Sequence, residues 1–517
     1  MSITKRIVFG AGASWFSRGM TIILGLLLMP VLFRKLGQEE LGVWMLLGQT
    51  WILLGIFDFG LSLTLTRRIA LAKGKSGSDP SAILTEQTKR EVADLVESGK
   101  LIYRWLSVGV FLSSFIIGAL YLNRLQLTTL DVKDAWLAWA ILCLCQALGV
   151  WAAVWSNLLQ GMGYVGWDAL LSSIIGALVL VAQILAVAFG GGLIALASLA
   201  AVGSLVLRFS MLQFARRRMP DLFATRGTWN PAMVRAMLPA AFRSWITSCG
   251  IVMTMNSDQY FITGMQGVTE LPAYRAAYIV IFNLRILAVS VATASAVFVS
   301  HLWQSGHLVE VHRVVIRNLK FGLGIMAAGG ACVLVLGARL FDTWIGPHNF
   351  IGYPCLIVFF ALLISDAHCC IVSESSRATE DEAFALCSAV AGMLKLGLAW
   401  LLGMRYGLLG IAASTLIAQL CTNHWYMVTR GLYRLQIPLS LHLRMVLLPV
   451  AVLFSVILLA TRLLVMMQPF ASGWVSIIAV SAVGSLFLAA FLWLFVLEPE
   501  QRQRILAFGR KKFRIST

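Results

Sequence analysis

The sequence predicts an all-α polytopic membrane protein with about 14 transmembrane helices. Two observations predict this class. Of the 517 residues, 59% are apolar and only 12% are charged. Runs of about 20 apolar residues, the length that crosses a hydrocarbon layer about 30 Å thick, recur along the whole chain. The stretches between these runs are short, so the sequence leaves little room for a soluble globular domain.

The apolar runs define the predicted spans, and their ends are placed to within a few residues. The first run is too long for a signal-peptide core and has no small-residue cleavage site before Arg34, so we interpret it as a retained helix. The predicted spans are 7–33, 41–66, 101–122, 136–160, 168–189, 193–215, 236–263, 273–302, 319–340, 353–376, 383–404, 408–429, 444–467 and 474–497.

The distribution of basic residues predicts the orientation of the helices. With a cytoplasmic N-terminus, most of the 41 Lys and Arg residues fall on the cytoplasmic side, including 216–218 and the tail at 510–514. An even number of spans then returns the C-terminus to the cytoplasm. The net charge of +18 follows from this topology and from contact with anionic lipid head groups, so nucleic acid is not expected as a partner.

The loops and the cysteines favour a transport protein over an enzyme. The external loops are too short for a catalytic domain. The one long connector, 67–100, contains a helix expected to begin at Asp79 and Pro80 and to lie on the membrane surface, with partner binding as the alternative. The nine cysteines follow no metal-ligand or disulfide pattern. We therefore expect no catalytic residues, no metal site and no cofactor.

An internal repeat groups the first twelve predicted helices into two sets of six. The aligned residues are Ser14-Trp15 with Ser244-Trp245, Gly37 with Gly267, and Glu40-Leu41 with Glu270-Leu271. The predicted regions are an N-lobe at 1–215, a cytoplasmic linker at 216–235, a C-lobe at 236–430, and 431–517 with two further helices and a basic tail. An even number of spans separates the copies, so the lobes are parallel pseudo-symmetric repeats with a substrate path expected near the midplane.

Ionisable side chains inside the predicted spans mark the candidate site. A charge that faces lipid costs several kcal/mol, so such residues normally face protein or a water-filled cavity. The cations are Arg18, Arg243, Arg285 and Lys395, and the anions are Asp58 and Asp258. One span carries Arg243, Thr247, Gly250, Thr254 and Asp258 on a single helical face. We therefore expect Thr247 and Thr254 to line the same polar path.

The buried charges allow two interpretations. Asp58 and Arg18 lie at similar depths on adjacent helices, so they either form a structural ion pair or leave Arg18 available to a ligand. Four cations against two anions leave excess positive charge, which favours an anionic ligand held by guanidinium groups. Asp58 and Asp258 are expected to bind a coupling cation, Na⁺ or H⁺, or to balance charge. Interfacial or packing roles are assigned to His301, His368, Asp366 and Glu374.

Three short segments carry a family resemblance: "RKLGQEELGVWMLL" (34–47), "FDFGLSLTLTRRIAL" (57–71) and "YGLLGIAASTL" (406–416). They resemble the polysaccharide transporter family, the Wzx-type O-antigen and exopolysaccharide flippases of the multidrug/oligosaccharidyl-lipid/polysaccharide superfamily. The resemblance, which covers essentially the whole chain, implies a V-shaped bundle that works by alternating access through a cavity lined by helices 1, 2, 7 and 8. It implies a polyprenyl-pyrophosphate-linked glycan as cargo, moved from the cytoplasmic to the periplasmic leaflet of a bacterial inner membrane.

The residues and the resemblance together predict a flippase for surface polysaccharide synthesis. Arg18, Arg243, Arg285 and Lys395 would hold the pyrophosphate or acidic sugars, and a polysaccharide polymerase and the export machinery would be partners. Three alternatives remain. A flippase for the lipid-linked peptidoglycan precursor would share the fold. A cation-coupled multidrug antiporter would have twelve helices and an acidic cavity. A polysaccharide polymerase or ligase would need a large extramembrane loop.

Overall fold

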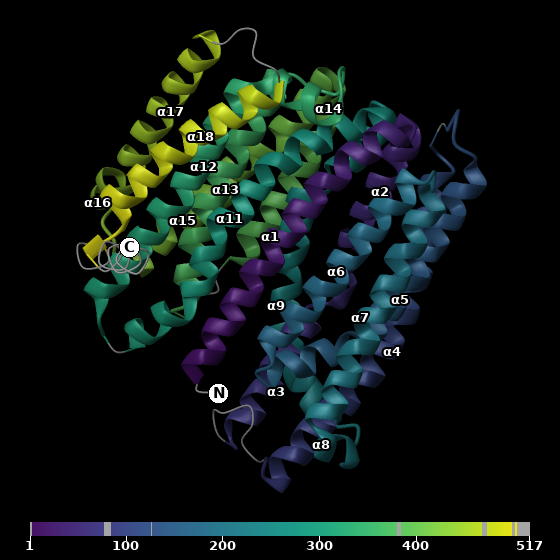
Figure 1. Ribbon diagram of the computed structural model, residues 1–517. Coiled ribbons are helices and arrows are strands. Elements are labelled where there is room, and N and C mark those ends of the chain that lie inside the picture. The colour runs from purple at the N-terminus through teal and green to yellow at the C-terminus, as the bar shows by residue number, and fades with distance from the viewer. Residues whose placement is uncertain are drawn as a thin grey trace, which may run out of the picture. The chain divides into compact units, whose positions relative to one another are not determined.

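The computed structural model describes residues 3–76, 84–125, 127–304, 306–379, 384–467, 473–498 and 502–503, and these ranges contain helices and no strand (Figure 1). The predicted all-α class is thereby confirmed. The chain divides into two compact units. The first unit comprises Met1–Pro272 and Ser388–Ile411, and the second comprises Ala273–Cys387 and Ala412–Thr517. The division into lobes at 215 and 236 stays a prediction.

The first unit is a bundle in which α1 packs along α6, and α5 packs against α3, α4 and α7 (Figure 1). Its core contains the buried side chains of Ile69, Tyr103 and Leu158 near one end of the bundle, and those of Val43 and Trp139 near the other. Its helices are α1 (Ile3–Lys35), α2 (Gln38–Leu54), η1 (Gly55–Asp58), α3 (Leu61–Gly74), α4 (Glu86–Leu122), α5 (Val132–Gly161), α6 (Val165–Ala188), α7 (Leu193–Arg218), α8 (Pro220–Ala224), α9 (Pro231–Asn256), α10 (Asp258–Met265) and η2 (Val268–Glu270).

The second unit is centred on α12, which packs against α13, α17 and α18. Its described part contains three short π-helical segments: η3 and η4 each join two α-helices, and η5 follows the end of α18. Its elements are α11 (Leu271–Gln304), α12 (Leu308–Ile345), α13 (Tyr353–Arg377), η3 (Leu420–His424), α15 (Trp425–Arg434), α16 (Leu439–His442), η4 (Leu443–Leu447), α17 (Leu448–Met467), α18 (Gly473–Phe491) and η5 (Leu492–Val496), and α14 (Ala385–Gln419) contributes residues to both units.

The described part of each of the fourteen predicted spans is mostly helical. By length and apolar composition, ten helices of the described chain could cross a membrane, or up to eleven if the bent α9 counts as one span. The predicted count of fourteen therefore stays a prediction. Asp79 and Pro80 lie outside the described residues. The connector helix instead begins at Glu86, capped by the hydroxyl of Thr85, and continues as α4 into the span rather than as a separate surface helix.

The second predicted span is broken in its middle. Between η1 and α3, Phe59 and Gly60 both have positive φ, at 50° and 69°. Glycine adopts this conformation without a steric penalty, whereas phenylalanine rarely does. Gly60 also lies against α9, because a Cβ atom there would be 2.4 Å from the carbonyl oxygen of Ala241. The chain therefore turns sharply at 59–60 and restarts as α3, and the predicted continuous helix over 41–66 is wrong at this point.

Two adjacent acidic residues join three segments of the first unit. The buried carboxylate of Glu39 accepts the backbone N–H groups of Thr128, Thr129 and Leu130 at 2.6, 2.6 and 3.0 Å. The carboxylate of Glu40 accepts the backbone N–H of Leu193, the first residue of α7, at 2.6 Å. Helix N-termini and clustered N–H groups favour negative charge. The turn between α1 and α2 is therefore fixed to the α4–α5 loop and to the start of α7.

Candidate functional site

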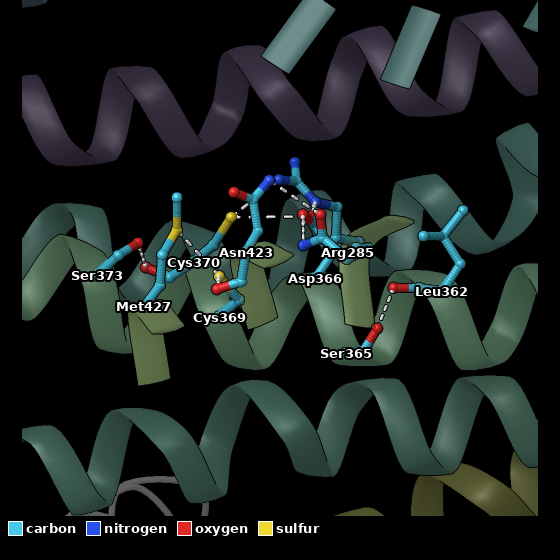
Figure 2. Close-up of polar contacts among 10 residues, drawn as sticks. Arg285, Leu362, Ser365, Asp366, Cys369, Cys370, Ser373, Asn423 and Met427 are labelled. Carbon is cyan, nitrogen blue, oxygen red and sulfur yellow. Dashed lines mark hydrogen bonds and ion pairs between the residues drawn. The ribbon is translucent and has the colours of Figure 1, made fainter. Parts of the chain in front are cut away.

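In the second unit, Arg285 of α11 and Asp366 of α13 form a largely buried ion pair. The Nε of Arg285 donates to Oδ2 of Asp366, whose Oδ1 accepts the amide of Gln419 at 3.2 Å (Figure 2). The Nη2 of Arg285 lies 3.1 Å from Sγ of Cys370, and its guanidinium lies 5.5 Å from the ring centroid of Phe282. The carboxylate of Asp366 is thus paired with a cation and hydrogen-bonded on both oxygens.

This pair corrects the charge count made from the sequence. Asp366 is the partner of Arg285, not a packing residue near the inner end of its helix. Arg285 and Asp366 lie at nearly equal numbers of residues from the starts of α11 and α13, at Leu271 and Tyr353. Equal depth on helices that run in the same direction was the signal that could have identified the pair. The excess of cations over anions is therefore smaller than the sequence indicated.

In the first unit, Lys395 of α14 is fully buried and also has a carboxylate partner. Its Nζ lies 2.7 Å from Oδ1 of Asp258, donates to the hydroxyl of Ser257, and lies 4.9 Å from the ring centroid of Phe261. These partners lie where α9 ends at Asn256 and α10 begins at Asp258. The pair therefore joins α14 to the junction between α9 and α10. The single helical face expected over 243–258 is interrupted at this junction.

The rest of that face changes environment along α9. Arg243 is exposed, and no ion pair of the described residues includes it. Thr247 donates to the carbonyl of Arg243 at 3.2 Å, and the buried Thr254 donates to that of Gly250 at 2.8 Å, so both hydroxyls are bonded to their own helix. A Cβ at Gly250 would meet the carbonyl of Ser388 at 2.3 Å, so this part of α9 faces α14. Of the predicted cations, Arg243 is the one exposed in the described structure.

Asp58 forms local hydrogen bonds at the break in the second span. Its Oδ2 accepts the backbone N–H of Ser62 at 3.0 Å and its Oδ1 accepts the Ser62 hydroxyl at 2.9 Å, which stabilises the first turn of α3. The Ser62 hydroxyl is in turn bonded to the Tyr103 hydroxyl at 2.9 Å. The side chain of Arg18 lies outside the described residues, so the predicted Asp58–Arg18 pair stays a prediction, as does a direct role for Arg18.

Trp245 on α9 was missed by reasoning from the sequence. Its Nε1 donates to the carbonyl of Ile56 at 2.9 Å, a backbone acceptor in η1 at the helix break. Its ring lies 5.2 Å from that of Phe59. The internal repeat, which aligns Trp245 with Trp15, was the available signal. Among the described residues, no group of three or more His, Cys, Asp or Glu is placed to hold a metal ion.

Comparisons with known proteins identify a family and a fold. Residues 9–298 match the family model described as polysaccharide biosynthesis protein. A solved structure named as the lipid II flippase MurJ in an inward closed conformation superposes with a TM-score of 0.69 at 16% identity, covering 94% of this chain and 98% of that one.

Solved structures of transporters of the MOP superfamily are also similar in fold. An inward-facing multidrug resistance MATE family transporter of the MOP superfamily gives a TM-score of 0.62 at 13% identity, over 82% of this chain and 98% of that one. A MOP superfamily transporter from Pyrococcus furiosus, described as having a binding pocket of reversed polarity, gives a TM-score of 0.57 at 16% identity, over 84% of this chain and 96% of that one. None of the curated proteins matches the sequence. These similarities show the fold.

Proposed function

Because this chain belongs to the family of polysaccharide biosynthesis proteins and has the fold of MOP superfamily transporters, we propose that it flips a polyprenyl-pyrophosphate-linked oligosaccharide repeat unit from the cytoplasmic to the periplasmic leaflet. The flipping step would work by alternating access in a bacterial inner membrane and would supply a surface polysaccharide. A polysaccharide polymerase and the export machinery would take the flipped product.

The observation that carries the proposal is the exposed Arg243 in an apolar span. A guanidinium in contact with lipid hydrocarbon would be unfavourable by several kcal/mol, so it must face water, a ligand or another polar group. Lys395 and Arg285 have carboxylate partners, whereas Arg243 has none among the described residues. A planar guanidinium fits phosphate oxygens with two parallel hydrogen bonds. We therefore assign first contact with the pyrophosphate to Arg243, with Arg18 as the second predicted cation.

The experiment compares Arg243→Gln with Arg243→Lys in proteoliposomes that carry a polyprenyl-pyrophosphate-linked oligosaccharide. Loss of a charged hydrogen bond of about 1.5–3 kcal/mol predicts a roughly 10- to 150-fold fall in flipping for the glutamine variant, with partial retention for lysine. The matched control is Arg235→Gln, an exposed arginine near the start of the same helix, which should flip at the parent rate. Parental flipping by Arg243→Gln, or equal loss in the control, would refute the assignment.

A flippase for the lipid-linked peptidoglycan precursor is the second candidate, supported by the similarity to a structure named as a lipid II flippase. Both cargoes carry a polyprenyl pyrophosphate, so the cationic site does not separate them. Complementation does: the first proposal expects rescue of a strain that lacks its polysaccharide flippase, and rescue of a strain that lacks its peptidoglycan flippase would favour the second. Export of cationic drugs in exchange for Na⁺ or H⁺ would instead favour the multidrug antiporter.

A further inference from the structure

Three histidines of the second unit form a continuous chain of imidazole rings. His368 lies on α13, His424 ends the π-helical turn η3, and His442 ends α16. The Nδ1 of His368 is 3.1 Å from Nε2 of His424, and its Nε2 is 2.9 Å from Nε2 of His442. His368 and His442 are buried, at 6% and 1% exposure. The packing role assigned to His368 from the sequence therefore does not describe all of its contacts.

The ring geometry is that of hydrogen bonds and not of metal ligation. The planes of His368 and His442 differ by only 8° while their centroids are 5.0 Å apart and their nearest nitrogens 2.9 Å apart, so the rings meet edge to edge. The two nitrogens of His368 contact different neighbours. Metal ligands converge on one point with one nitrogen from each ring, which this arrangement does not provide. The chain is therefore a series of N–H···N hydrogen bonds.

The hydrogen bonds set how many protons the chain can hold. A neutral imidazole has one N–H donor and one acceptor nitrogen, and each N···N contact needs one hydrogen. Three neutral rings satisfy both contacts. One added proton also satisfies both, whichever ring carries the charge, because the hydrogens can shift along the chain. A second added proton would place two N–H groups face to face. The chain can therefore take one proton and move its charge from ring to ring.

Asp366 is the acidic group that lies beside this chain. It stands two residues before His368 on α13, and its Oδ1 accepts the amide of Gln419, whose side-chain oxygen accepts the amide of Asn423, the residue before His424. Burial disfavours a charged imidazole, so a proton on the chain depends on a nearby negative charge. Asp366 also contacts Arg285 and Cys370. The neighbouring Cys369 is bonded to the carbonyl of Asn423 and the sulfur of Met427 instead (Figure 2). An imidazolium in this chain and the guanidinium of Arg285 would thus both be stabilised by one carboxylate.

We propose that the chain His442–His368–His424 binds one proton, and that this proton and Arg285 compete for Asp366. Proton uptake weakens the hold of Asp366 on Arg285, and departure of Arg285 in turn strengthens proton binding, because such a coupling is reciprocal. The consequence for transport rests on the proposed function: a released Arg285 becomes available to the anionic head group, which makes H⁺ the coupling ion of the second unit.

The test is a histidine titration in lipid bilayers without any lipid-linked substrate, followed by ¹⁵N solid-state NMR of the imidazole nitrogens. The signals of the seven histidines are assigned by comparing variants with the parent protein. His368→Phe should remove the protonation step that the three rings share. His312→Gln should leave that step in place, because the Nε2 of His312 contacts a backbone carbonyl outside the chain of rings. Arg285→Gln should raise the proton affinity of the chain about 10- to 1,000-fold, the usual effect of one nearby carboxylate. Asp366→Asn should lower it, and Arg285→Lys should leave it near the parent.

Arg285→Gln and Asp366→Asn are expected to shift the titration midpoint in opposite directions. The proposal therefore stays refutable if one of the two variants folds poorly. Arg243→Gln in the first unit is the control and should leave the midpoint unchanged. A midpoint that stays at the parent value in Arg285→Gln or in Asp366→Asn overturns the proposal, as does simultaneous charging of two of the three rings. Since the titration contains no substrate, a failure of flipping with the shifts intact refutes the proposed function alone.

Discussion

The buried pair between Lys395 and Asp258 gives the sharpest stability prediction. Lys395→Met removes the ammonium group and keeps much of the side-chain volume, and Asp258→Asn removes the negative charge. Because the Lys395 side chain is 0% exposed and Asp258 only 11%, neither charge can be solvated when its partner is lost. Removing one partner of such a pair costs about 3–5 kcal/mol.

The double variant should recover much of this loss. With both charges gone, no buried charge remains uncompensated, so the coupling energy of the cycle should reach about 2–3 kcal/mol. The matched control is the pair Lys75–Glu91, which has the same 2.7 Å separation but side chains that are 61% and 29% exposed. Exposed pairs contribute about 0.2–1 kcal/mol, so this second cycle should show little coupling.

The assay is unfolding of the purified protein in detergent, followed by tryptophan fluorescence, with flipping measured in parallel. Additive losses in the Lys395–Asp258 cycle, or equal coupling in both cycles, would refute the reasoning. The flipping assay separates two roles of Lys395. A double variant that is stable and active has lost only a structural pair, whereas a stable but inactive one supports the predicted contact with an anionic ligand.

Two further predictions concern the first unit. Gly60→Ala should lower the free energy of unfolding by more than about 1–2 kcal/mol, because alanine is disfavoured at φ 69° and its Cβ would meet the Ala241 carbonyl. The control is Gly109→Ala on α4, where an added Cβ would have no atom within 4 Å. That variant should have a melting temperature no lower than the parent. Burial opposes ionisation of Glu39, but its hydrogen bonds from 128–130 outweigh this effect and lower its pKa from the ordinary 4.5. The contribution of Glu39 to the free energy of unfolding is therefore complete above pH 4.5 and is lost as the pH falls through the lowered pKa. The melting temperature of the parent should thus fall in acid by an amount that the Glu39→Gln variant does not show.

The positions of the helices could be predicted from the sequence, whereas their interruptions could not. Apolar composition locates a segment that prefers the membrane, and this property is the same for a straight and a broken helix. The break at Phe59 and Gly60 depends on contacts from α9, including the hydrogen bond from Trp245 to Ile56. The local signal was Asp58 in a position to cap α3, which an apolar run conceals.

The candidate site was predictable residue by residue but not in its pairing. Arg243, Arg285, Lys395 and Asp258 are identifiable because ionisable groups are rare in apolar spans. Pairing requires knowing which helices are neighbours, and the apolar pattern gave Asp366 a position near the inner end of its helix. The imidazole chain was less accessible still, because His368, His424 and His442 come from three separate elements whose packing brings them together.

The two adjacent glutamates also limit how the first unit can change shape. Glu39 and Glu40 fix the α1–α2 turn to the α4–α5 loop and to the start of α7, so at that end of the bundle five helices are expected to move as one body. Farther along the second predicted span, the backbone at Phe59 and Gly60 is not helical, so the helix is interrupted at this point. The second span is thus fixed at one end and flexible in its middle. We expect bending within the first unit to be concentrated at residues 59–60, between η1 and α3.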